Sequence, residues 1–175
     1  MMGQQHMFKQ VTGFAVVLAL AACGGEKAER TITTSDGSTL SVKKGDRAGE
    51  AKITATNAEG SATMTTGGAG QWPTAAAGYV PPYPGGVVTA SFAGSSKEAS
   101  GGMVTFTTSD SPDKVVEFYK AQAASAGLGD VSNIDINGAK IFAAKDKATG
   151  RSVSIQATVS EGRTSAAVTF GTDKK

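Results

Sequence analysis

The period-two alternation in the last third of this chain most strongly limits what it can fold into. In the stretches 153–159 and 164–170, mostly apolar side chains occupy every second position. A turn sequence at 160–163 separates the two stretches. Because side chains two residues apart share one face of a strand, the pattern predicts antiparallel strands with one dry and one wet face. The positions on the dry face are Val153, Ile155, Ala157 and Val159, then Thr164, Ala166, Val168 and Phe170.

One segment breaks this strand pattern and predicts a helix. Ser111 is a good N-cap, Pro112 suits the first turn, and Asp113 favours the positive end of a helix. Gly127 stands where a left-handed C-cap belongs. The residues at helical spacing between these signals are Val115, Phe118, Tyr119, Gln122 and Ala126.

Strand signals on both sides of this helix complete a domain over 87–175. Strands are expected at 87–92 and 103–108 before the helix, and at 131–136 and 139–144 after it, where Asn137-Gly138 is a type I′ turn signal. The predicted fold class is α+β. The expected order along the chain is two strands, one helix and a four-strand meander. The strands form an antiparallel sheet, and the helix packs on one face of it.

Residues 31–66 predict a small Thr-rich β-hairpin region before that domain. Asp36-Gly37 and the sequence 57–60 are turn signals between alternating stretches. One face carries Ile32, Leu40, Val42, Ile53 and Met64, and the other carries almost only Ser and Thr. Two readings stay open: a small sheet that lies on another surface, or a partly ordered arm.

Residues 67–86 predict an extended linker, because four of the five prolines of the chain fall there. The same segment holds Trp72, Tyr79 and Tyr83. Aromatic side chains between prolines can present an epitope to a partner, which makes these three residues candidate partner contacts. Alternatively, they fold back onto the sheet and cover its apolar face, since a small core needs large side chains.

The N-terminal segment has the three parts of a secretory signal. Lys9 supplies the positive charge, 11–20 is apolar, and Ala21 and Ala22 are the small residues before Cys23. Such a stretch is too short to cross the roughly 30 Å of a bilayer core as a helix. One reading is an ordinary cleaved signal with a chance cysteine; the other is a lipoprotein signal.

The sequence Leu20-Ala21-Ala22-Cys23 resembles that of bacterial lipoprotein precursors, whose pattern is Leu, a small residue, Ala or Gly, and Cys. The resemblance implies a signal peptide at 1–22. It also implies that Cys23 carries acyl chains such as palmitate and begins a lipidated tether, 23–30. The residue after the cysteine is Gly and not Asp, which in this family implies the outer membrane. We expect the periplasmic face of that membrane, and exposure at the outer surface stays open. Whether translation starts at Met1 or Met7 stays open.

From Tyr83 onward the chain also resembles a recurring, uncharacterised type of small bacterial envelope lipoprotein domain. The similar features are the sequences 83–85 and 108–112, the Phe118-Tyr119 pair and Gly127. The resemblance implies a lipid-tethered α+β module and carries no activity with it.

The residue inventory excludes much chemistry. The single His, His6, precedes the expected mature chain, and the single Cys is Cys23. We therefore predict no catalytic site, no metal site, no cofactor and no disulfide. Lys and Arg number 17 against 15 Asp and Glu, a balance that gives no electrostatic reason to expect a nucleic-acid partner.

These observations favour a lipid-anchored, non-enzymatic protein of the cell envelope that acts as an interaction or structural module. Its expected partners are the membrane, through acylated Cys23, and another envelope protein. The alternative is a periplasmic small-ligand-binding lipoprotein with a pocket between helix and sheet. The residues expected to line that pocket are Phe106, Phe118, Phe142 and Phe170.

Overall fold

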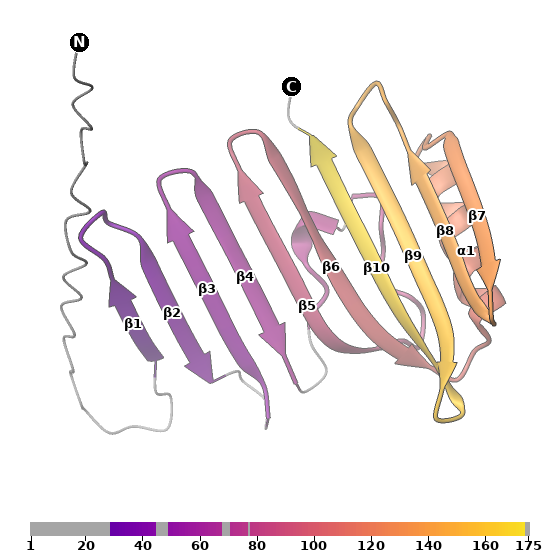
Figure 1. Ribbon diagram of the computed structural model, residues 1–175, viewed down its shortest axis with the longest axis horizontal. Helices are drawn as coiled ribbons and strands as arrows, with labels where there is room; N and C mark the ends of the chain where they lie inside the picture. Colours follow the sequence, from indigo (N-terminus) through magenta and orange to yellow (C-terminus); the bar gives the residue numbers. More distant parts are fainter. Residues whose placement is uncertain (1–28, 45–48, 68–70, 77, 174–175) are drawn as a thin grey trace, which may run out of the picture.

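The computed structural model describes residues 29–44, 49–67, 71–76 and 78–173. In these ranges the chain forms one antiparallel sheet of ten strands with one α-helix, α1 (Pro112–Ser125), and one short 3-10 helix, η1 (Thr74–Ala76) (Figure 1). The strands are β1 (Glu29–Thr33), β2 (Thr39–Lys44), β3 (Ala51–Asn57), β4 (Gly60–Thr66), β5 (Val87–Ser96), β6 (Ala99–Thr108), β7 (Asp130–Ile136), β8 (Ala139–Lys145), β9 (Arg151–Ser160) and β10 (Arg163–Asp173).

The strand order is β1-β2-β3-β4-β5-β6-β10-β9-β8-β7. The first six strands follow one another across the sheet in chain order. The helix then carries the chain from β6 to the far edge, where β7 begins, and the last four strands return until β10 pairs with β6. All strand pairs are antiparallel, which hairpin connections favour.

The predicted fold class, with two strands, a helix and a four-strand meander behind a small hairpin region, is wrong. Strand β4 pairs with β5 from Gly60↔Ser96 to Thr66↔Ala90, so the hairpins are the first strands of the same ten-stranded sheet. The Gly- and Pro-rich sequence between β4 and β5 led to the error. Composition predicts no long regular element there, and the described part of the segment holds only the three-residue η1. Composition does not show whether the flanking strands pair.

The helix is confirmed with its expected ends. The Ser111 side chain accepts a hydrogen bond from the backbone N–H of Lys114 at 3.4 Å, and Pro112 occupies the first turn. Gly127 has a positive φ of 76°, the left-handed conformation that glycine adopts without strain. No helix in the described part of the chain has the length and apolar character needed to cross a membrane.

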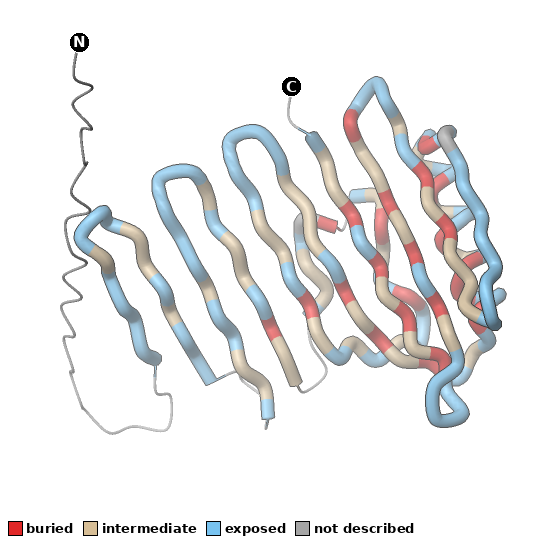
Figure 2. Tube along the Cα trace, viewed as in Figure 1, coloured by how far each residue is buried: buried red, intermediate tan, exposed pale blue. Residues whose placement is uncertain are grey.

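The core lies on one face of the sheet, under α1 and the 71–86 segment, both of which run behind the strands in Figure 1. Helix residues Val115, Tyr119 and Ala123 are buried there. Figure 2 shows that buried positions concentrate in β6 and β8–β10 and become rare toward β1. The buried sheet residues include Val104, Phe106, Phe142, Ile155, Val168 and Phe170.

The face of the sheet that carries the apolar side chains differs between its two halves: it is the helix side in β6 and β8–β10, and the opposite side in the first strands. In the first strands the apolar side chains lie on the face opposite α1, which we call the open face. Five of them are direct neighbours in register on adjacent strands: Val42, Ile53, Met64, Phe92 and Met103, here called the apolar row. Their side chains are 39–45% exposed. The segment 31–66 therefore has the two-faced pattern expected from its sequence.

Gly102, in β6, lies where β5 comes close to β6 and leaves no room for a side chain. A Cβ atom there would lie 2.2 Å from the carbonyl oxygen of Phe92 and 2.8 Å from the Phe170 ring, so Gly102→Ala must shift backbone. We expect it to lower the free energy of unfolding by about 1–3 kcal/mol, measured by urea denaturation. Gly129→Ala is the control, because nothing lies within 4 Å of its Cβ. Equal stability of the two variants would contradict this packing.

Candidate ligand-binding groove

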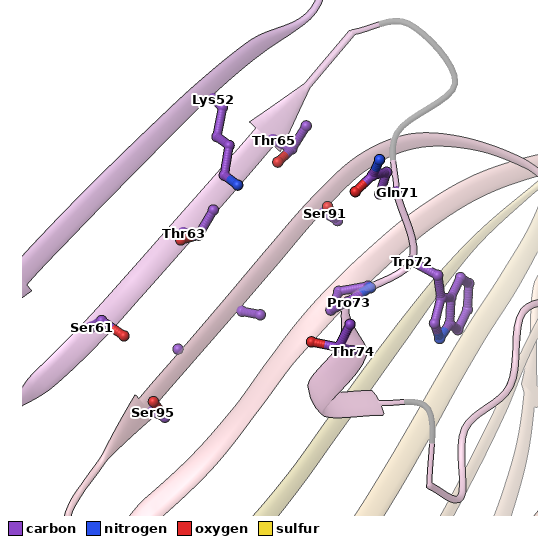
Figure 3. A pocket seen from close by; sticks show the side chains of 12 residues that line it. Lys52, Ser61, Thr63, Thr65, Gln71, Trp72, Pro73, Thr74, Ser91 and Ser95 are labelled. Atoms are coloured by element: carbon purple, nitrogen blue, oxygen red, sulfur yellow. The ribbon is translucent and has the colours of Figure 1, made fainter. Parts of the chain in front are cut away.

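A hydroxyl-lined groove of about 370 Å³ lies on the helix side of the sheet. Its floor is formed by β3, β4 and β5, and its wall by the chain from Gln71 to Thr74 (Figure 3). The lining residues are Lys52, Ser61, Thr63, Thr65, Gln71, Trp72, Pro73, Thr74, Ser91, Ala93, Gly94 and Ser95.

The register of three strands places the hydroxyl groups of the floor. Thr65 pairs with Lys52 on one side and with Ser91 on the other, so the three side chains share a face. Thr65 and Ser91 are each only 8% exposed. Beside them the hydroxyl oxygens of Thr63 and Thr54 lie 3.2 Å apart, in hydrogen-bond contact. The floor is therefore a set of hydroxyl groups whose positions are set by three paired strands.

Trp72 fixes the wall of the groove. Its indole N–H donates a hydrogen bond of 2.8 Å to the carbonyl oxygen of Val80, and its ring lies 6.4 Å from that of Phe106. Figure 3 shows the indole pointing away from the floor, whereas Gln71, Pro73 and Thr74 border the groove. Trp72 thus anchors the wall to the core.

Tyr79 fastens the same segment to the end of the sheet. Its hydroxyl donates a hydrogen bond of 2.6 Å to the carbonyl oxygen of Gly171 and also lies within hydrogen-bond distance, 3.2 Å, of the carbonyl oxygen of Ser152. The guanidinium carbon of Arg151 lies 5.6 Å from the centre of the tyrosine ring, within the range of a cation–π contact.

Tyr83 is the most deeply buried of the three candidate partner contacts, at 8% exposure. Its ring stacks on Phe106 with centroids 5.4 Å apart and meets Phe118 edge-on at 5.2 Å. Trp72 and Tyr79 also pack against the core cluster. The alternative in which these aromatic residues fold back onto the sheet therefore describes the structure, and they do not form a free epitope. The remaining site prediction, Cys23, lies outside the described residues.

A polar contact closes the outer side of the Tyr83 ring. The Tyr83 hydroxyl donates to the carboxylate of Asp110 at 2.8 Å, and the Lys114 ammonium lies 3.3 Å from the other carboxylate oxygen. The Tyr83 hydrogen bond and then Lys114 lower the pKa of Asp110. Burial, with the hydrogen bond to Asp110, raises the pKa of Tyr83 to about 12. The phenol therefore stays protonated and donates throughout the neutral range.

The interior between helix and sheet is filled with side chains where the alternative ligand pocket was expected. A void lined by Phe106, Phe142 and Phe170 would leave these side chains accessible, but they are 1%, 1% and 4% exposed. The rings of Tyr83 and Tyr119 lie 5.4 Å and 6.4 Å from that of Phe106. The fourth expected lining residue, Phe118, is only partly buried.

The groove offers many hydrogen-bonding groups, one cation and no carboxylate among its described lining residues. Hydroxyl groups both donate and accept, and Lys52 can donate to an oxygen or neutralise an anion. The described residues contain no group of three His, Cys, Asp or Glu side chains placed to hold a metal. The Ser/Thr face of 31–66 is evident from the sequence, but the groove is not, because it requires β4–β5 pairing and the returning 71–76 segment.

Comparison with known proteins gives one similarity. Residues 87–168, just under half of the chain, match a family model described as START domain-like. The matched part contains α1 and the strands from β5 into β10, but not β3 and β4 of the groove floor. No curated protein and no solved structure matches the chain.

The Tyr83–Asp110 contact predicts an acid-dependent loss of stability. Because the pKa of Asp110 is lower in the folded protein, its ionised form stabilises the fold above the unfolded aspartate pKa of about 3.9. That contribution disappears as the pH falls through the lower, folded pKa. Asp110→Asn should therefore be less stable than wild type at pH 7, and the gap should close in acid, as measured by urea denaturation across pH.

Tyr83→Phe is the matched control, because it removes the hydrogen bond that lowers the Asp110 pKa most. In this variant the further Asp110→Asn change should alter the pH dependence less than it does in wild type. A stability gap between wild type and Asp110→Asn that stays constant from neutral to acidic pH would contradict the linkage.

Proposed function

We propose that the protein is a lipid-anchored, non-enzymatic component of the bacterial cell envelope whose folded part binds a polyhydroxylated ligand in the groove. The class of ligand that fits best is a glycan of the envelope. The observation that carries the binding role is the floor of positioned hydroxyl groups with Lys52 at its edge. The anchoring role rests on the sequence 20–23.

The chemistry of the groove suits a sugar. A glycan presents hydroxyl groups that donate and accept, which match the serine and threonine side chains of β4 and β5. Each such bond adds only about 0.5–1.5 kcal/mol net, so an open groove of this kind supports weak binding through several contacts. Lys52 extends the choice to sugars that carry a carboxylate or a phosphate.

Anchoring agrees with such a role. Two or three acyl chains on Cys23 would hold the protein at a bilayer without any membrane-spanning helix. We place it at the outer membrane, facing the periplasm, where envelope glycans are accessible. Weak binding suffices there, because a tethered protein meets a fixed ligand at high effective concentration.

A second candidate function is the binding of a small apolar ligand between α1 and the sheet. The similarity of residues 87–168 to a START domain-like family favours ligand binding by that half of the chain. The packing of the phenylalanine and tyrosine rings argues against a preformed cavity there. Recovery of an apolar molecule from native, purified protein by mass spectrometry would support this candidate.

Anchoring is tested by replacing the cysteine. Cys23→Ser removes the only sulfur that an acyltransferase can modify, so the protein should move from the membrane fraction to the soluble periplasmic fraction. Mass spectrometry of the wild-type N-terminal peptide should show the added acyl chains. A bare Cys23, or a variant that still sediments with membranes, would contradict the lipid anchor.

The groove is tested by side chains that line it. Ser61→Ala and Lys52→Gln each remove one hydrogen-bonding or charged group and should weaken binding of soluble peptidoglycan fragments about 2- to 10-fold in calorimetry. Thr158→Val is the control, because Thr158 lies in β9 on the open face. Binding that is absent in wild type, or unchanged in both groove variants, would contradict the proposal.

A further inference from the structure

The open face carries a contiguous row of partly exposed apolar side chains. The apolar row crosses five adjacent strands, from Val42 in β2 to Met103 in β6. Ile32 and Leu40, a register pair in β1 and β2, extend it and are 43% and 40% exposed. Contiguous apolar patches of this kind mark interaction sites on soluble proteins.

A line of small residues runs beside the apolar row. In register across β3–β6 it consists of Ala55, Ala62, Gly94 and Gly101. Part of this line, together with Ile32 and Leu40, borders a shallow depression of about 510 Å³. The face therefore has an apolar ridge and an adjoining hollow whose base is apolar and whose border also carries Ser, Thr and Asn side chains and Glu59.

The size of this surface argues against a second protein copy as its occupant. Six strands at about 4.8 Å spacing and two side-chain rows along each strand give a footprint of roughly 24 Å by 12 Å, or about 300 Å². A stable protein interface needs about 800 Å² from each partner. A lipid surface has no such minimum for a chain that is already tethered, because each inserted side chain adds to an existing attachment.

The charges of the face favour a lipid surface as well. Arg30 in β1 and Lys44 in β2 lie on the open face, since Arg30 pairs with Val42 and Lys44 with Ala51. No Asp or Glu within the strands β1–β6 lies on this face, since the carboxylate of Glu29 pairs with Lys43 on the opposite side. The one carboxylate among the described residues that border the depression is Glu59, in the turn between β3 and β4, and it lies 3.9 Å from the Lys97 ammonium. Anionic lipid headgroups attract unpaired cations next to an apolar surface.

We propose that the open face of β1–β6 lies flat on the bilayer that holds Cys23. The apolar row inserts at the boundary between headgroups and acyl chains, and Arg30 and Lys44 contact anionic headgroups. This inference rests on the proposed lipid anchor. Cys23 precedes Glu29 by six residues, which span at most about 20 Å, so the face begins within reach of the anchor. The groove, on the other face, then points away from the membrane.

Adjacent residues on opposite faces give a matched test in the lipidated full-length protein. Met64→Cys places a thiol on the open face, and Thr63→Cys places one in the groove. Each is labelled with bimane and reconstituted in phosphatidylethanolamine vesicles that contain one quarter phosphatidylglycerol. Lipids with brominated acyl chains should quench the probe at residue 64 about twofold or more and leave the probe at residue 63 unchanged. Phe92→Cys and Ala93→Cys repeat the comparison one strand further.

The outcomes separate this inference from the anchor. Equal quenching on both faces, or no quenching on the open face, overturns the inference. Energy transfer between probes on two copies, with the residue 64 probe shielded from lipid, also overturns it, because the open face would then contact a second copy. Wild type has no cysteine except Cys23, so label on wild type shows a bare thiol and overturns the anchor instead. In that event Cys23→Ser chains with Met64→Cys or Thr63→Cys, mixed with the same vesicles, still report on the sheet face.

Discussion

A ten-stranded sheet exposes more surface than one helix of 14 residues can cover, and this shortage of a second layer governs the rest of the structure. Helix α1 and the 71–86 segment cover the sheet mainly where β6 and β8–β10 bury their side chains. On the β1 side of β5, the only cover among the described residues is the groove wall from Gln71 to Thr74, on the helix side of the sheet. The sequence accommodates this by placing Ser and Thr on one face of β1–β5 and apolar residues on the other. The switch of apolar face between β5 and β6 is therefore the central feature of the molecule.

The aromatic residues of the 71–86 segment take the place of a second helix. Trp72, Tyr79 and Tyr83 each combine ring packing with one or more hydrogen bonds from the polar end of the ring. These bonds tie an irregular segment to the sheet and to the start of α1 without regular secondary structure. The same segment forms the wall of the groove, so the core contacts and the candidate site depend on one another.

Local signals in the sequence predict the elements well and their assembly poorly. Ser111, Pro112 and Gly127 define the helix because caps depend on neighbouring residues. Asn137-Gly138 and the alternation after residue 150 locate the last hairpins for the same reason. The pairing of β4 with β5 across a 20-residue connection leaves no local mark, so the expected fold class was wrong.

The candidate site follows the same rule. Hydroxyl groups on alternate positions of 31–66 were evident from the sequence, but the groove needs three paired strands and the returning segment, which are long-range features. The aromatic residues between prolines had two readings, and only the packing of Tyr83 on Phe106 separates them. Cys23 is different, because its expected role depends on a short motif and on no fold.

The two proposals assign distinct roles to the two faces of the sheet. The hydroxyl face carries the groove in which we propose that a polar ligand binds, and the open face carries the apolar row with Arg30 and Lys44. A lipid anchor next to the edge strand β1 would orient both faces at once.

The orientation of the sheet on a bilayer tests this account most directly. Polarised infrared spectroscopy of the lipidated protein on a supported phosphatidylethanolamine and phosphatidylglycerol bilayer measures the direction of the amide I transitions, which lie in the plane of the sheet. We predict that they lie parallel to the membrane. Transitions with a strong component along the membrane normal would mean that the sheet stands upright, and would contradict the account.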